Sequence, residues 1–237
     1  MIQSSPQAEK AARLILLRHG QASLGTSDYD RLSTLGRQQA EALRERLGKA
    51  GMLDSPTMSG SLKRQRQTLG LLGSSGAARV DESLNEYTVD QLIRTTVEQA
   101  EFLGVDVPDK QAFSDPASYL ATFLDWFPTV LALWQTERLR CAYNGPWADF
   151  HARVTSPIPH WRAHLAAGAS LVVVSSAGVI STALAHMLGE DLGWQRELNV
   201  RLYNASLSEL TLDEDGRWNA LRINCVDHLE PDAVTLA

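Results

Sequence analysis

Two short apolar runs constrain the fold of this chain more than any other feature of its sequence. The first, LILL, occupies residues 14–17, and the second, LVVV, occupies residues 171–174. Neither run shows the alternation of apolar and polar residues that is typical of a strand covered on one face only. Unbroken apolar runs of this length favour strands that are buried on both faces, as in a parallel sheet with helices on either side.

The segments between these runs predict helices and further strands. Ser33 is suited to cap a helix over residues 34–49, in which Ala40, Leu43 and Leu47 recur at helical spacing. Strands alternating with helices predict an α/β fold of three layers, α/β/α, around a mostly parallel central sheet. The other expected elements are a weak strand at residues 56–59, a helix opening at 61–68, helices over 147–167 and 179–188, and late strands over 206–212 and 218–223.

Residues 88–146 carry apolar helical stretches but no strand pattern. The stretches cover residues 95–103 and 119–134, with prolines, including Pro128, as expected breaks. We interpret this segment as a helical insertion over the strand ends of a single domain, residues 1–237. Its aromatic side chains either line an apolar substrate pocket or, as we favour, form the insertion's own small core or a homodimer contact. The aromatic residues concerned are Phe102, Phe113, Tyr119, Phe123, Trp126, Phe127, Trp134 and Tyr143.

The overall charge excludes several classes of partner. With a formal net charge of −6 and a pI of about 5.5, the chain is a poor general binder of nucleic acid. No stretch approaches the roughly 18 apolar residues of a membrane span, and the first residues lack the apolar segment of a secretory signal. Cys141 and Cys225 form neither a disulfide framework nor a metal-binding spacing. We therefore expect a cytoplasmic protein that binds neither nucleic acid nor a membrane.

Arg18, His19 and Gly20 follow the first apolar run directly. Ligands of open α/β sheets bind at the carboxyl ends of the strands, so these residues stand where a substrate is expected. A histidine with an ordinary pKa of about 6.5 is largely neutral at pH 7 and can attack phosphorus. Arginine offers a planar fork that matches phosphate oxygens. The alternative is that both side chains are ordinary loop residues after a strand.

The segment LILLRHGQAS resembles the opening strand and Arg-His-Gly motif of the histidine phosphatase superfamily, which has a phosphoglycerate-mutase-like fold. Further segments resemble motifs of this family and occur in its order. These segments are RLSTLGRQQAEAL (residues 31–43), SGSLKRQRQT (59–68), LNEY (84–87) and LYNASLSEL (202–210). The resemblance covers most of the chain apart from its first residues, residues 88–146 and the tail, and it implies the three-layer fold.

The resemblance also implies roles for individual residues. His19 would form a phosphohistidine that water then hydrolyses, while Arg18 and Arg64 would hold the phosphoryl group. Glu86 would donate a proton to the leaving oxygen and later activate water. The substrate would be a small phosphorylated metabolite, without a metal or another cofactor. Nearby carboxyl groups that compete for the role of Glu86 are those of Asp81, Glu82 and Asp90.

Two further residues have weaker assignments. Ser23 is a candidate to line the phosphate pocket, and Asn204, at the family's Asn-x-Ser position, is a candidate to orient a loop near it. A purely structural role explains either residue equally well. Among the remaining histidines, His160 and His164 are spaced as metal ligands on a helix can be, but they lack a carboxylate partner, so we expect structural roles for both.

One segment departs from the family's pattern. The family has a second histidine after its last central strand, in a Ser-His-Gly-Gly context, whereas here Ser176, Ala177 and Gly178 follow that strand. Ser176 thus occupies the place of an imidazole that helps hold the phosphoryl oxygens. Its hydroxyl and the free N–H groups at the start of the next helix, including that of Ala177, can partly compensate. Losing one such donor typically costs about 10²–10³ in rate.

Three functions follow as hypotheses. The first is a metal-independent phosphatase that acts on a small phosphomonoester through a phosphohistidine on His19. The second is a catalytically weakened or inactive phosphate-binding member of the same fold, because of Ser176. The third, a phosphoglycerate mutase, is disfavoured because the Arg-His-Gly motif continues as QASLG and not as an acidic residue followed by Ser-x-Trp-Asn.

Overall fold

The computed structural model describes residues 11–23, 28–109 and 116–236, and of residues 116, 117 and 119 only the backbone. Within this part of the chain lies a six-stranded sheet with the strand order β3-β2-β4-β1-β5-β6. The first four strands run parallel, whereas β5 is antiparallel to β1 and β6. The expectation of a mostly parallel α/β sheet is therefore confirmed. The strands are β1 (Leu14–Arg18), β2 (Thr57–Ser59), β3 (Ala78–Val80), β4 (Leu171–Ser175), β5 (Leu207–Leu212) and β6 (Trp218–Cys225).

The apolar run of β1 is buried on both faces, as its sequence predicted. Leu14 and Leu16 belong to the apolar cluster on one face of the sheet, and Ile15 and Leu17 belong to the cluster on the other. β1 lies between β4 and β5, so neither of its edges is exposed. This central position fixes the carboxyl end of β1, and therefore His19, between the ends of the neighbouring strands.

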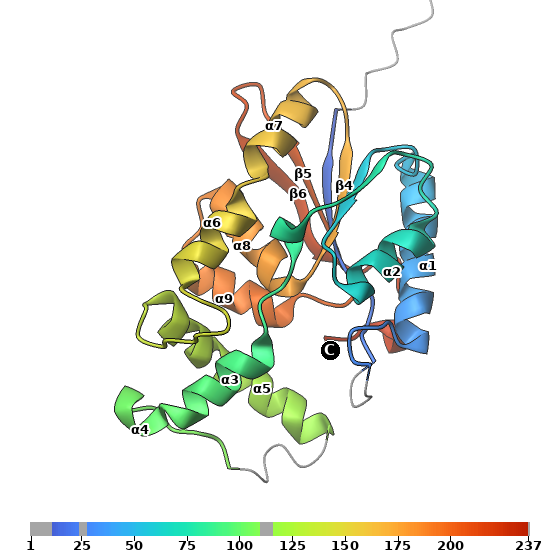
Figure 1. Ribbon diagram of the computed structural model, residues 1–237. Helices are drawn as coiled ribbons and strands as arrows, with labels where there is room; N and C mark the ends of the chain where they lie inside the picture. Colours follow the sequence, from blue (N-terminus) through green and yellow to red (C-terminus); the bar gives the residue numbers. More distant parts are fainter. Residues whose placement is uncertain (1–10, 24–27, 110–115, 237) are drawn as a thin grey trace, which may run out of the picture.

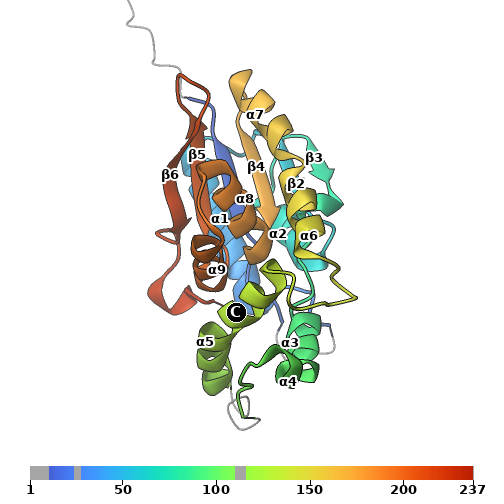
Figure 2. The same cartoon turned by 90° about the vertical axis from the view of Figure 1, so that its left-hand side faces the viewer.

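Helices cover both faces of the sheet (Figures 1 and 2). Ser33 caps the first of them as predicted, since its Oγ accepts the Gly36 N–H at 2.9 Å. On one face lie α1 (Thr34–Ala50) and α2 (Lys63–Leu72). On the other lie α6 (Trp147–Thr155), α7 (Ile158–Ala166) and α8 (Ala177–Leu188), with α9 (Leu192–Arg201) packed against α8. The described residues also form the short 3-10 helices η1 (Glu82–Leu84) and η3 (Pro231–Ala233).

The remaining helices lie beyond the carboxyl ends of the parallel strands (Figures 1 and 2). They are α3 (Val89–Glu98), α4 (Ala100–Leu103) and α5 (Pro116–Gln135), and the described part of residues 88–146 holds no strand. Trp126, Phe127 and Trp134 of α5 join the same apolar cluster as Leu14 and Leu16 of β1. The interpretation of a core separate from the sheet was therefore wrong for these rings. The single domain and the insertion remain predictions.

Two prolines act differently from the expectation. Pro128 lies inside α5 and does not break it, because the neighbouring Phe127 and Val130 are buried and hold the helix in place. Conversely, the single helix expected over residues 147–167 is divided into α6 and α7. Pro157 has no N–H for the Arg153 carbonyl, which instead accepts the Ser156 hydroxyl at 2.8 Å.

Candidate active site

A cavity of about 660 Å³ lies at the carboxyl ends of β1 and β4. It brings together all the candidate site residues except Ser23, which its described lining does not include. Ser23 is buried, and its backbone N–H donates to the Arg31 carbonyl at 2.8 Å, so its phosphate-binding role stays a prediction. The candidates that line the cavity are Arg18, His19, Arg64, Glu86, Ser176, Ala177 and Asn204.

The sheet register explains why distant residues meet here. Arg18 pairs with Ser175 across β1 and β4, so His19 and Ser176 are the next residues at two adjacent strand ends. The His19 N–H extends this ladder by donating to the Ser175 carbonyl at 2.9 Å. β5 is antiparallel to β1, so its beginning, preceded by Asn204, reaches the same edge. The strand directions alone therefore gather three segments around His19.

Gly20 allows the chain to turn away directly after His19. A Cβ atom at this position would lie 2.2 Å from the Gly36 carbonyl oxygen in the first turn of α1, a distance that no side chain tolerates. The Gly20 N–H donates to Thr68 Oγ1 of α2 at 3.1 Å. The turn after His19 is thus held between α1 and α2.

His19 is buried, and its hydrogen bonds indicate a neutral ring. Its Nδ1–H donates a hydrogen bond to the Gly20 carbonyl at 2.7 Å, and its Nε2 accepts the Arg64 Nε–H at 3.0 Å. Burial, together with the positive charges of Arg64 and Arg18, holds the pKa of His19 well below 6.5. The lone pair of Nε2 therefore points toward Arg64, which lines the same cavity.

Arg64, near the start of α2, has a second partner that the sequence did not reveal. Its Nη1 donates to Asp30 Oδ1 at 2.6 Å, and Asp30 Oδ2 accepts the Lys63 N–H at 2.7 Å. The guanidinium also lies 5.8 Å from the centre of the Tyr29 ring. Asp30 thereby fixes the direction of the arginine fork. No motif marked Asp30, because its contact depends on how the loop before α1 packs on α2.

The Arg18 guanidinium has one buried N–H, at Nε, that lacks a hydrogen-bond acceptor among the described residues. Its Nη1 donates to the carbonyls of Leu202 and Leu236, the latter at 2.8 Å. Burial lowers the pKa of Arg18 to about 10, so the side chain is still positively charged at neutral pH. A buried N–H without an acceptor is costly, and an anion in the cavity is the kind of group that relieves this cost.

Glu86 lies against the beginning of α8. Its Oε2 accepts the Gly178 N–H at 2.7 Å and its Oε1 accepts the Tyr87 N–H at 3.1 Å. Burial nevertheless raises the pKa of Glu86 above 4.5, although these bonds and the nearby Arg64 favour the ionised form. Gly178 permits this approach, since a Cβ atom there would lie 2.4 Å from Glu86 Oε1. Of its three competitors, only Asp90 lines the cavity.

Ser176 and Asn204 complete the polar end of the cavity. Ser176 is the N-cap residue of α8, and its Oγ accepts the Gln65 Nε2–H at 2.9 Å. Asn204 Oδ1 accepts the Thr235 hydroxyl at 2.9 Å, and its N–H donates to the Thr235 carbonyl at 2.8 Å. Asn204 thus holds the segment whose next residue, Leu236, contacts Arg18. The predicted orienting role of Asn204 agrees with this position but stays a prediction.

The other histidines lie outside the described lining of this cavity. The His151 ring packs against His186 with centroids 5.6 Å apart, and the rings of His160 and His164 on α7 are 6.4 Å apart. In the described ranges, no group of three or more His, Cys, Asp or Glu side chains is placed to hold a metal ion. Cys141 and Cys225 are both free thiols. Among the described helices, none combines the length and apolar character needed to cross a membrane.

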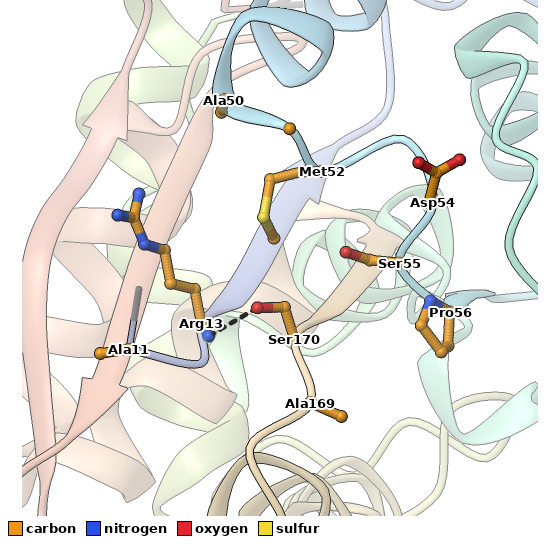
Figure 3. A pocket seen from close by; sticks show the side chains of 10 residues that line it. Ala11, Arg13, Ala50, Met52, Asp54, Ser55, Pro56, Ala169 and Ser170 are labelled. Carbon is orange, nitrogen blue, oxygen red and sulfur yellow. Dashed lines mark hydrogen bonds between the residues drawn. The ribbon is translucent and has the colours of Figure 1, made fainter. Parts of the chain in front are cut away.

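A second cavity, of about 300 Å³, lies at the amino ends of β1, β2 and β4, and Figure 3 shows the side chains that line it. There the Arg13 N–H donates to Ser170 Oγ at 3.0 Å. The Arg13 guanidinium is already paired with the buried Glu209, with 2.6 Å between Nη1 and Oε1. Because Arg13 is already paired with a carboxylate and Asp54 also lines this cavity, we place no anion there.

We predict that His19 stays uncharged well below pH 6.5 and that Arg64→Met raises its pKa by removing a nearby positive charge. The measurement is an NMR titration of the His19 ring in phosphate-free buffer. Arg66→Met is the matched control, since Arg66 is exposed on the same helix and should leave His19 unchanged. A His19 ring that titrates at its ordinary pKa of about 6.5 in the parent protein would contradict the described electrostatics.

Comparisons with known proteins agree with this fold. The sequence model of the histidine phosphatase superfamily (branch 1) matches residues 14–116 and 120–226. No relative was found among curated proteins. A mycobacterial glucosyl-3-phosphoglycerate phosphatase is 24% identical, with a TM-score of 0.60 over 91% of this chain and 99% of that one. A phosphoserine phosphatase mutant from Entamoeba histolytica, in complex with phosphoserine, is 15% identical, with a TM-score of 0.58 over 92% of this chain and 100% of that one. The match to the family over most of its length shows that this chain belongs to branch 1 of the histidine phosphatase superfamily.

Proposed function

We propose that this protein is a metal-independent phosphatase that hydrolyses a small phosphomonoester through a phosphohistidine on His19. The observation that carries the proposal is the contact of a neutral, buried His19 Nε2 with Arg64 Nε at 3.0 Å, inside a cavity that also holds Glu86. A neutral imidazole is the nucleophilic form, and the neighbouring cation is suited to hold the phosphoryl group under attack.

In the first step, a phosphoryl oxygen of the bound substrate takes over the Arg64 Nε–H that His19 Nε2 accepts. The freed Nε2 lone pair attacks phosphorus, and the bond from phosphorus to the ester oxygen breaks. Glu86, in its protonated form, gives its proton to that oxygen, so that an alcohol leaves. Arg18 and Arg64 balance the charge on the phosphoryl oxygens. The unpartnered Arg18 Nε and the first N–H groups of α8 at Ser176 and Ala177 supply further donors.

In the second step, water attacks phosphorus of the phosphohistidine and the bond from phosphorus to Nε2 breaks. The ionised Glu86 takes the proton of the attacking water, which restores its protonated form. The products are inorganic phosphate and free His19. Splitting one displacement into two replaces a difficult step with two easier ones.

The relatives support the reaction class. Structures of the mycobacterial phosphatase include a complex with inorganic phosphate, and the structure from Entamoeba histolytica contains phosphoserine. Those ligands are phosphate and a phosphomonoester, the two kinds of molecule that the proposed reaction releases and consumes. At these low sequence identities the relatives support the class of reaction and not a particular substrate.

We predict that His19→Ala abolishes hydrolysis of 4-nitrophenyl phosphate, because no other histidine in the described lining replaces the nucleophile. Trapping with ³²P-labelled substrate should label the parent protein and not the variant. His160→Ala, which removes an exposed histidine of α7, is the control and should retain full activity. Normal turnover by the His19 variant would eliminate this residue as the nucleophile.

We predict that Glu86→Gln lowers kcat/KM by roughly 10²-fold or more for benzyl phosphate, whose alcohol needs a proton to leave. The loss should be much smaller for 4-nitrophenyl phosphate, since 4-nitrophenolate leaves unprotonated. In the parent, kcat/KM for benzyl phosphate should fall as pH rises through the raised pKa of Glu86, because only the protonated acid can donate. Glu82→Gln is the control, as Glu82 is exposed outside the cavity lining. Equal losses on both substrates would exclude a proton donor at this position.

A second candidate, a catalytically weakened phosphate-binding protein, is supported by Ser176, which lines the cavity and is held by Gln65. This candidate predicts phosphate binding with little or no turnover, and it predicts that Ser176→His raises kcat/KM at least tenfold by restoring a donor. Ser176→Asn is the control, because it adds a hydrogen-bonding side chain without an imidazole. The candidate is wrong if the parent already hydrolyses esters and Ser176→His is no faster.

A further inference from the structure

The cavity that holds His19 has two chemically different regions. One region is the polar end around His19, Arg64 and Glu86. The other is an apolar wall. Two of the helices that contribute to it, α3 and α5, lie beyond the carboxyl ends of the parallel strands (Figures 1 and 2). This wall consists of Val89 of α3, Leu120, Phe123 and Phe127 of α5, and Val200 of α9.

Aromatic rings connect the two regions. Tyr87, the residue after Glu86, stacks on Phe127 with ring centroids 6.4 Å apart and planes at 25°. Phe127 stacks in turn on Phe123, at 4.6 Å and 17°. The Tyr87 hydroxyl is already bonded to Asn199 Nδ2 at 2.7 Å. The series of rings therefore starts beside the proposed proton donor and ends at Phe123. Tyr87 and Phe127 are buried and support Phe123, which is half-buried and offers apolar surface to whatever is attached to the phosphate.

The charged groups of the lining argue against a second anionic group on the substrate. Its described cations are Arg18 and Arg64, and Arg64 is already paired with Asp30. The lining also includes the acidic side chains of Asp30 and Asp90. A carboxylate or second phosphate on the substrate would meet these carboxyl groups, and the described lining holds no further cation to balance it.

We propose that the substrate is the phosphomonoester of an uncharged, largely apolar alcohol or phenol, whose leaving group lies against Leu120 and Phe123. This inference rests on the proposed function, whose site it specifies. The apolar wall favours burial of hydrocarbon, whereas a sugar hydroxyl held against Val89 or Phe123 would lose water without gaining a hydrogen bond from those side chains. A cavity of about 660 Å³ suits a small molecule of this kind.

Binding of non-hydrolysable phosphonates tests the inference without turnover. We expect benzylphosphonate to bind at least tenfold more tightly than 2-hydroxyethylphosphonate, which is polar, or 3-phosphonopropionate, which adds a carboxylate. The measurement is isothermal titration calorimetry on the full chain. Equal affinities, or tighter binding of either polar phosphonate, would overturn the proposed substrate class.

Turnover gives a second test with matched leaving groups. Benzyl phosphate and glycerol 1-phosphate both release primary alcohols, so their kcat/KM ratio reports mainly on contacts with the wall. We expect a ratio of at least ten in the parent. Phe123→Ala should reduce that ratio severalfold and leave inhibition by inorganic phosphate unchanged. Phe102→Ala is the control, because Phe102 is 87% exposed and lies outside the described lining.

The possible outcomes separate this inference from the proposed function. Preferential binding of benzylphosphonate without hydrolysis of any ester supports the substrate class and rejects the phosphatase. Hydrolysis of both esters at equal kcat/KM supports the phosphatase and rejects the substrate class. Phe123→Leu keeps an apolar side chain at the same place and should retain most of the ratio. If Phe123→Ala unfolds, Phe123→Asn tests the same contact. The proposal is wrong if a folded Phe123→Ala or Phe123→Asn variant has the same ratio of kcat/KM values for benzyl phosphate and glycerol 1-phosphate as the parent.

Discussion

The contact between Arg64 Nε and His19 Nε2, 3.0 Å long, is the interaction on which the rest of the site depends. It joins the end of the central strand to the start of α2, two segments that are distant in the chain. The same cation helps to keep the imidazole neutral, and it balances charge where a phosphoryl group would lie. Asp30 holds the other side of the guanidinium, so the arginine has little freedom to turn away.

Strand direction supplies the remaining geometry. The parallel pair β1 and β4 ends at one edge, and the antiparallel β5 begins there, so residues from both kinds of neighbour surround His19. Burial then shifts the pKa values of two groups in opposite directions. It lowers the pKa of His19 and raises that of Glu86. The same cavity therefore holds a neutral imidazole as nucleophile and favours the protonated form of the Glu86 carboxyl group.

The sequence predicted the parts of this arrangement that depend on local pattern. The apolar run of β1 and the Ser33 cap were readable from local residue pattern, and His19 from its place after that run. Arg64 was marked only by its resemblance to a motif of the family. Asp30 was missed, since its role arises only from packing between a loop and α2. The edge strand β3 and helix α9 were also missed. The first is short and exposed, and the second presents few apolar residues at regular spacing.

The hairpin between β5 and β6 turns at the edge of the sheet opposite His19, because β5 runs antiparallel to β1 (Figures 1 and 2). Asp213 stabilises this turn, with its Oδ1 accepting the Asp215 N–H at 3.0 Å and the Arg217 N–H at 2.7 Å. Glu214 is exposed between these anchored residues. A dye or a tether to a solid support, attached at Glu214, would therefore sit a whole strand length from the cavity and leave its mouth open to solution.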